Sequence, residues 1–162
     1  MKPEEKARAT EVRVEQAVNA SPETVWNLVT DVTRMGEWSP EATGATWVKG
    51  ATGPAVGARF KGTNRNGGKT WSTNGKVVVA APGRVFAFEV TSGPFAVATW
   101  RYSIEAGDNG CIVTETWIDQ RNGLVKRLGK MASGVSDRAD HNRRSMEETL
   151  AALAATAESA PR

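Results

Sequence analysis

Two residue types that often build reactive sites are nearly missing from this chain. Its 162 residues include one cysteine, Cys111, and one histidine, His141. A lone cysteine cannot form an intramolecular disulfide, and it fits a reducing cytosol. One histidine with one cysteine cannot supply the ligands of a usual zinc site. We therefore expect no metal, and nothing in the sequence predicts a cofactor.

Long apolar runs are also missing. No segment approaches the ~20 apolar residues that a membrane-spanning helix needs. The first eleven residues are charged and do not resemble a signal peptide, so we expect a cytoplasmic protein. The net charge of +3, with a pI of about 9.2, is too weak to predict nucleic-acid binding.

The stretch 122–159 contains no proline, and its apolar residues recur at helical spacing. We predict one long amphipathic helix over this stretch. On a single helical wheel, Asn142 falls close to the apolar stripe, whereas His141 falls on the opposite side. We therefore expect Asn142 to be buried with a hydrogen-bond partner in the sheet, in a water or in a ligand, and His141 to lie on the surface.

The chain before this helix reads mostly as strands. Residues 11–19 alternate apolar and polar side chains, and Ser21-Pro22-Glu23 has the chemistry of a helix start. A second short helix is expected within 31–38. Six further strands are predicted, joined by turns such as Asn66-Gly67-Gly68, over residues 43–49, 58–65, 69–80, 84–90, 96–105 and 111–119.

This order of elements predicts an α+β fold. A curved antiparallel sheet of about seven strands would wrap around the long C-terminal helix, with two short helices after the first strand. We expect a single domain over 10–158, with flexible termini at 1–9 and 159–162.

The inward face of the last strand is ambiguous. If Glu115 and Asp119 face water, then Thr114 and Thr116 face inward and Trp117 is exposed. The opposite phase would bury Glu115, which would then need a partner. We favour the first phase.

Several segments together resemble a known family. They are Ser21-Pro22-Glu23-Thr24-Val25-Trp26, Glu37-Trp38-Ser39-Pro40, Gly57-Ala58-Arg59-Phe60-Lys61-Gly62, Thr70-Trp71 and the helix from His141 to Leu153. The chain resembles the SRPBCC superfamily, the START-like helix-grip fold, and in particular its bacterial polyketide cyclase/dehydrase-like branch. This resemblance covers roughly residues 10–158. It implies a hydrophobic cavity between the curved sheet and the long helix.

The predicted inward faces supply candidate ligand-binding residues. They are aromatic, aliphatic or neutral polar: Phe60, Asn64, Trp71, Thr73, Phe86, Phe88, Trp100, Tyr102, Thr114, Thr116, Met131, Val135, Asn142 and Met146. Trp71 and Trp100 either stack on a ligand or only pack in the core. No general base is evident, so no catalytic residue is assigned. We expect Asp31, Glu37 and Glu41 to be solvated, although one of them at a cavity mouth could move protons.

Such a set of side chains suits a mostly apolar ligand held at a few polar points. The leading hypothesis is binding of a small hydrophobic molecule such as a lipid, a polyketide or an aromatic metabolite. One alternative is a polyketide cyclase or dehydratase, with Tyr102 or a carboxylate at the mouth moving protons. A second is a protein-interaction module, whose cavity would be filled by its own side chains. The sequence leaves the oligomeric state open.

Overall fold

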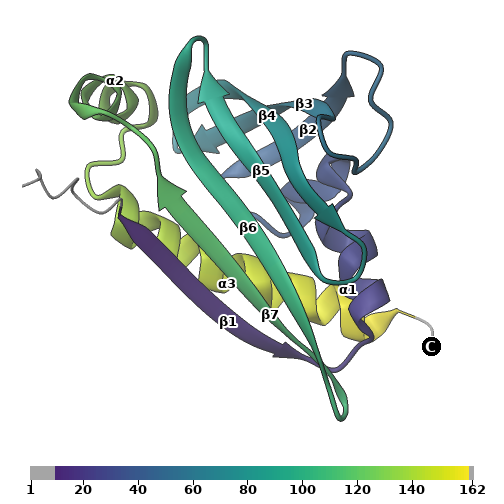
Figure 1. Ribbon diagram of the computed structural model, residues 1–162. Helices are drawn as coiled ribbons and strands as arrows, with labels where there is room; N and C mark the ends of the chain where they lie inside the picture. The colour runs from purple at the N-terminus through teal and green to yellow at the C-terminus, as the bar shows by residue number, and fades with distance from the viewer. Residues whose placement is uncertain (1–9, 161–162) are drawn as a thin grey trace, which may run out of the picture.

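A seven-stranded antiparallel sheet forms the body of the molecule (Figure 1). The computed structural model describes residues 10–160. The strand order is β1-β7-β6-β5-β4-β3-β2, which confirms the predicted antiparallel α+β arrangement. The strands are β1 (Glu11–Val18), β2 (Ala42–Val48), β3 (Arg59–Asn66), β4 (Lys69–Ala81), β5 (Val85–Ser92), β6 (Phe95–Gly107) and β7 (Gly110–Asp119).

Two short helices follow β1, as the sequence predicts. Helix α1 (Pro22–Val29) begins where the Ser21 hydroxyl accepts a hydrogen bond from the Thr24 amide at 3.1 Å. The 3-10 helix η1 (Val32–Glu37) comes directly afterwards. Apolar residues of α1, Trp26 among them, are buried against the sheet, where the Trp26 ring meets the edge of Phe86.

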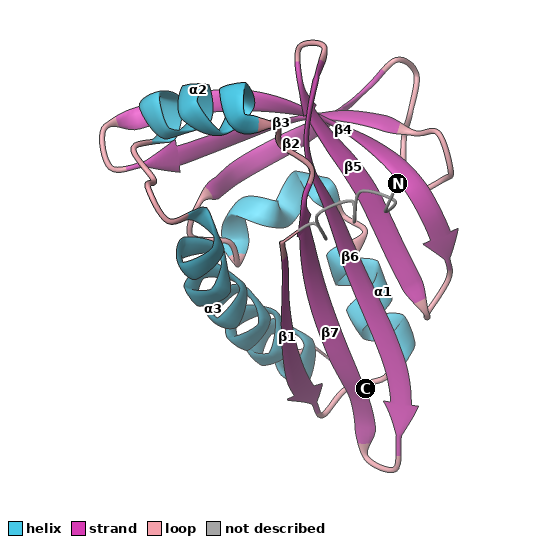
Figure 2. Cartoon of the chain, turned by 60° about the vertical axis from the view of Figure 1, so that its left-hand side comes forward, coloured by secondary structure: helices cyan, strands magenta, loops and turns pink. Residues whose placement is uncertain are grey.

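The C-terminal stretch forms two helices, so the prediction of one continuous helix is wrong. Helix α2 (Gly123–Ser133) ends at Gly134, whose φ of 73° lies in the left-handed region that glycine adopts without strain. Helix α3 (Arg138–Ser159) begins at Asp137, which caps it by accepting from the Asp140 amide at 3.0 Å. Figure 2 shows α2 lying apart from α3, beside the β3–β4 end of the sheet.

The main core lies between the sheet and the buried face of α3. Met146, Leu150 and Leu153 of α3 are each about 1% exposed. Burying one such side chain contributes about 1.5–3 kcal/mol. The inward residues predicted on β5 and β6, such as Phe86 and Tyr102, are also buried, which confirms their predicted faces.

The sheet is bent by local irregularities. The β-bulges at Val77/Val79 and Val90/Thr91 shift the register of neighbouring strands. At Gly75 the ring of Phe60 covers the strand so closely that a Cβ would overlap it. A glycine is required there because no other residue leaves room for the ring.

The ends predicted to be flexible fall mostly outside the described residues. Residues 1–9 and 161–162 are not described, and Ser159 is the last residue of α3. Within residues 10–160, no helix is long and apolar enough to cross a membrane.

Candidate functional site

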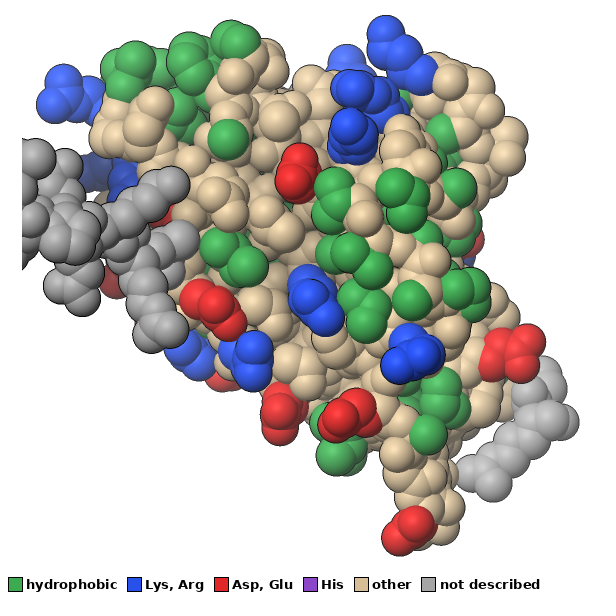
Figure 3. Space-filling view, viewed as in Figure 1, with side chains coloured by type: hydrophobic (Ala, Val, Ile, Leu, Met, Phe, Trp, Pro, Cys, Tyr) green, Lys and Arg blue, Asp and Glu red, His purple; other side chains and the backbone are tan. Residues whose placement is uncertain are grey.

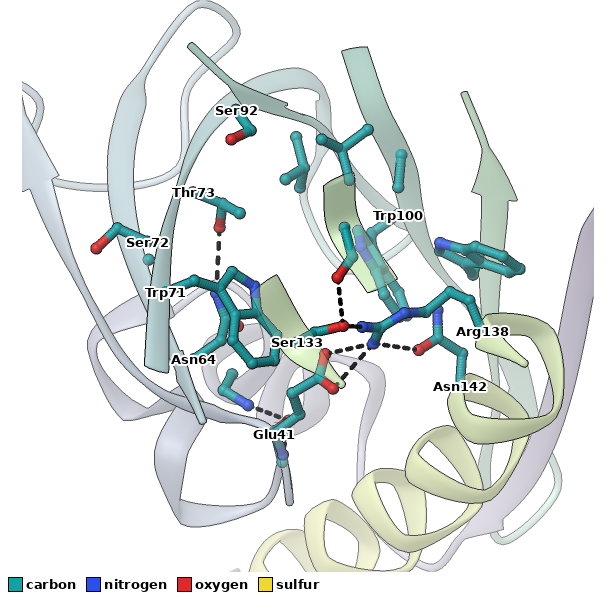
Figure 4. A pocket seen from close by; sticks show the side chains of 18 of the residues that line it. Glu41, Asn64, Trp71, Ser72, Thr73, Ser92, Trp100, Ser133, Arg138 and Asn142 are labelled. Atoms are coloured by element: carbon teal, nitrogen blue, oxygen red, sulfur yellow. Dashed lines mark hydrogen bonds and ion pairs between the residues drawn. The ribbon is translucent and has the colours of Figure 1, made fainter. Parts of the chain in front are cut away.

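A cavity of ≈ 510 Å³ lies between the sheet and α3. Strands β2 to β7 form most of its wall, and η1, α2, α3 and the segments that connect the elements contribute the remainder. Figure 4 shows Asn64, Trp71 and Thr73 on one side of this space and Arg138 and Asn142 of α3 on the other. The sheet therefore does not close completely onto the helix.

Aromatic rings dominate the apolar part of the wall. Phe60 and Phe88 meet edge to face with their centroids 5.2 Å apart, so each fixes the other's orientation. Trp71, Trp100 and Trp117 come from three further strands, β4, β6 and β7. Flat rigid rings of this kind offer a large apolar contact area at a small cost in conformational entropy.

One end of the cavity is open beside α2 and the β5–β6 hairpin. Two residues there, Leu128 of α2 and Phe95 of the hairpin, line the cavity although they are 47% and 39% exposed. Leu124 and Met131 are also exposed on α2. Figure 3 shows apolar side chains gathered at this end of the molecule. An apolar molecule would thus meet an apolar rim before it entered.

A buried acidic pair lies in the wall. Tyr102 of β6 is paired across the sheet with Glu115 of β7, and its hydroxyl donates to Glu115 Oε1 at 2.8 Å. Glu115 is 3% exposed, and burial raises its pKa to about 8. The pKa of Tyr102 is also raised well above its usual value, chiefly by burial. Glu115 is therefore mostly protonated at neutral pH.

A polar network joins the two sides of the cavity near the start of α3. Arg138 donates to both carboxylate oxygens of Glu41, at 2.8 and 2.9 Å, and to the Ser133 hydroxyl at 2.9 Å. His141 Nε2 lies 2.9 Å from Glu41 Oε2, and Arg138 also reaches the Asn142 side-chain oxygen at 3.4 Å. The network ties the segment before β2 to the junction of α2 and α3 (Figure 4).

Two contacts hold the C-terminal end of α2 against the β3–β4 hairpin. Asn66 donates to the Ser133 carbonyl at 2.8 Å, and Lys69 donates to the Met131 carbonyl at 2.9 Å. Both satisfy carbonyl groups that a helix end leaves free. At the other end, Arg121 binds the Asp119 carboxylate through two hydrogen bonds of 2.9 Å. The C-terminal end of α2 is thus held against the sheet beside the opening, and the Arg121–Asp119 pair orders the segment that leads into the helix.

Nine of the fourteen candidate residues lie on the cavity wall. They are Phe60, Asn64, Trp71, Thr73, Phe88, Trp100, Tyr102, Asn142 and Met146. Asn142 is 4% exposed and receives a weak hydrogen bond from Arg138, within the helix rather than from the sheet. The wall gathers these residues from β3, β4, β5, β6 and α3.

The other five candidates lie off the wall, for three different reasons. Phe86 is buried in the core beyond the cavity, next to Trp26. Met131 is 68% exposed on α2, and Val135 is buried in the α2–α3 junction, because the helix breaks between them. Thr114 and Thr116 lie on the opposite face of β7 from Glu115.

The favoured phase of the last strand is therefore wrong. Glu115 and Trp117 are each 3% exposed and line the cavity. The sequence had indicated that Glu115 would need a partner in this phase, and Tyr102 is that partner. The alternation of side chains along β7 does not show which face is inward, because Thr116, on the face opposite Glu115, is buried as well.

Two further expectations about polar residues are wrong. His141 and Glu41 were expected on the solvated surface, but their side chains are only 24% and 19% exposed and contact each other. The single helical wheel placed His141 wrongly because the break before α3 resets the helical phase. The signal was present in the sequence: Gly134 suits a helix end, and Asp137 suits the next helix start.

An antiparallel sheet curved around a C-terminal helix, with an apolar cavity between them, is a hydrophobic ligand-binding fold. The chain belongs to the polyketide cyclase/dehydrase and lipid transport family, whose model matches residues 9–158. The resemblance noted in the sequence is thereby confirmed. A search of curated proteins finds no significant match.

Solved structures agree with this fold. The Polyketide_cyc-like protein Cgl2372 from Corynebacterium glutamicum is 32% identical over 91% of this chain and 90% of that one, with a TM-score of 0.60. The di-domain ARO/CYC StfQ of the steffimycin biosynthetic pathway is 12% identical, with a TM-score of 0.72, over 93% of this chain and 52% of its own. Ginseng major latex-like protein 151 from Panax ginseng is 11% identical, with a TM-score of 0.70, over 93% and 99% of the two chains.

Proposed function

We propose that this protein binds a small, mostly hydrophobic molecule, such as a lipid, a polyketide or an aromatic metabolite, between the sheet and α3. The observation that carries the proposal is the cavity itself. Its volume of ≈ 510 Å³ falls within the ~300–1,000 Å³ of typical small-molecule sites. Its wall combines aromatic rings with a few polar groups, which is the usual composition of such sites.

Binding energy would come mainly from apolar burial, at roughly 25 cal/mol per Å². We propose that Trp71, Trp100 and Phe88 supply the largest contact areas, and that Asn64 and Thr73 help to orient the ligand. Asn64 donates to the Thr73 hydroxyl at 3.4 Å, so the two form one polar point on the sheet side of the cavity. The family's description, which includes lipid transport, supports a carrier of this kind.

A cyclase or dehydratase activity is the second candidate function. The observation in its favour is the Tyr102–Glu115 pair, since a protonated carboxyl on a cavity wall is a possible general acid. The same family description names cyclases and dehydrases. A protein-interaction module with a filled interior is disfavoured, because the interior is not filled by side chains.

Native mass spectrometry of the purified protein, with extraction of whatever copurifies, tests the proposal. We expect a bound apolar compound whose occupancy falls in the Trp71→Ala and Asn142→Ala variants. Lys76→Ala is the matched control, because Lys76 lies on the exposed face of the same strand as Trp71. A compound that binds equally well in all four proteins would contradict the assignment of the cavity as the binding site.

A further inference from the structure

The buried carboxyl of Glu115 has one oxygen without a partner. Oε1 accepts from the Tyr102 hydroxyl, whereas Oε2 is buried and has no hydrogen-bond partner among the described residues. Both residues line the cavity. Buried polar groups in native proteins are almost always satisfied. Oε2 itself is almost inaccessible, but Glu115 lines the cavity, so a bound molecule can supply the partner once the carboxyl group turns towards it.

The protonation state of Glu115 sets what that molecule must present. Burial raises the pKa of the carboxyl to about 8, so the neutral form predominates at neutral pH. Since Tyr102 donates to Oε1, the proton of the neutral carboxyl belongs on Oε2. Oε2 is then a hydrogen-bond donor, and its partner must be an acceptor.

The charged groups around the cavity do not favour the ionised form of Glu115. Arg121, after β7, is bound to Asp119, and Arg138 of α3 is bound to Glu41. His141 also bonds to the Glu41 carboxylate.

The elements packed closest to Glu115 present uncharged groups. Val14 of β1 is paired with it across the sheet, and Tyr102 is paired with it on β6. The wall residues of α3 beyond Arg138 are Asn142, Ser145, Met146 and Thr149. No cation among the described residues therefore stabilises an ionised Glu115.

We propose that Tyr102 and Glu115 form a subsite that donates a hydrogen bond to a neutral oxygen acceptor, such as a ketone carbonyl, of an otherwise apolar ligand. This rests on the proposed function and names its ligand class more narrowly. An anionic ligand is disfavoured because its charge would be buried in an apolar cavity whose arginines are already bound to Asp119 and Glu41. A purely hydrocarbon ligand would leave Oε2 unsatisfied.

A matched pair of fluorescent probes tests the subsite. The first is prodan, a naphthalene that carries a propionyl ketone, and the second is its propyl analogue, in which the carbonyl is a methylene. Binding of each is measured by fluorescence titration to the wild type, Glu115→Gln and Glu115→Leu. Because the two probes share shape and apolar area, the ratio of their affinities isolates the carbonyl.

The Gln and Leu variants show whether Glu115 acts on the ligand as a hydrogen-bond donor or through a negative charge. The Gln amide can accept from Tyr102 and still donate to the ketone, so the affinity ratio should stay within about two-fold of the wild type. Leu removes the donor, so the ratio of the affinity for prodan to that for its propyl analogue should fall roughly 2- to 12-fold. This factor corresponds to the free energy of one hydrogen bond. Between about pH 6 and about pH 9.5 the ratio should fall by a similar factor in the wild type and stay constant in Glu115→Gln.

Each outcome decides a different claim. A ratio that is equal in all three proteins and at both pH values would overturn the subsite, and would mean that a fixed water satisfies Oε2. A ratio lost in Glu115→Gln would also overturn it, because the amide N–H in the same place should donate to the ketone as the carboxyl O–H does. Failure of both probes to bind the wild type would contradict the proposed function itself. If Glu115→Leu does not fold, the pH profile of Glu115→Gln against the wild type decides alone.

Discussion

Replacing Glu115 by glutamine should change how the stability of the protein depends on pH. In the folded protein burial raises the pKa of this carboxyl from 4.5 to about 8. The folded state therefore holds a proton that the unfolded state releases once the pH exceeds about 4.5. The stability that Glu115 provides is fully present below that pH and is lost as pH rises towards the folded pKa.

The magnitude follows from the two pKa values. Over most of this interval the loss is about 1.4 kcal/mol per pH unit. Between about pH 5 and about pH 8 the free energy of unfolding of the wild type should fall by about 3–4 kcal/mol relative to that of Glu115→Gln. The glutamine amide does not titrate, so it leaves only a constant offset between the two proteins.

Urea titrations followed by tryptophan fluorescence, repeated across this pH range, measure the difference. Glu89→Gln is a suitable control because Glu89 is exposed on β5, and its profile should follow the wild type. A constant gap between Glu115→Gln and the wild type at every pH would refute the reasoning. It would mean that Glu115 is hydrated in the folded protein.

Two further predictions concern packing and the network at the start of α3. Gly75→Ala should lower the free energy of unfolding by about 1–3 kcal/mol, because the new Cβ would overlap a buried aromatic ring, whereas Gly44→Ala has open space and should change it little. Glu41→Gln should cost about 1–2 kcal/mol, because Arg138 would keep a half-buried charge without its carboxylate. Urea titration measures both, and an unchanged midpoint in either variant would contradict the corresponding contact.

The sheet was largely predictable because its strands alternate cleanly. On β5 and β6, charged residues such as Glu89 and Arg101 mark the outward face, so Phe86, Phe88 and Tyr102 could be assigned inward. In the middle of these strands, over 86–88 and 98–104, only one face carries large apolar side chains. The cavity itself was expected from the family resemblance rather than from any single residue.

The acidic pair was not predictable because β7 is buried on both faces at its centre. Thr116 and Trp117 are both buried, so alternation does not identify the inward side. The partner of Glu115 lies on β6, and only the register between the two strands brings Tyr102 opposite it. Sequence reasoning could state that a buried Glu115 needs a partner, but it could not supply the register.

The prediction of one continuous C-terminal helix failed for a different reason. When the break between two amphipathic helices is ignored, a single continuous helical wheel can place the apolar residues of both helices on one stripe. The break at Gly134 moved Met131 to the surface and brought His141 to Glu41. Weighing the glycine as a helix end would have separated the two helices.

The central claim is that a ligand enters the space between the sheet and α3. It is tested most directly by the indole N–H signals in NMR spectra recorded while prodan is added. Trp71 and Trp100 line the cavity, whereas Trp26 and Trp47 lie outside it. We expect saturable shifts for the first two and none for the other two. Shifts confined to Trp26 and Trp47, or no saturable shift of Trp71 and Trp100, would contradict the claim.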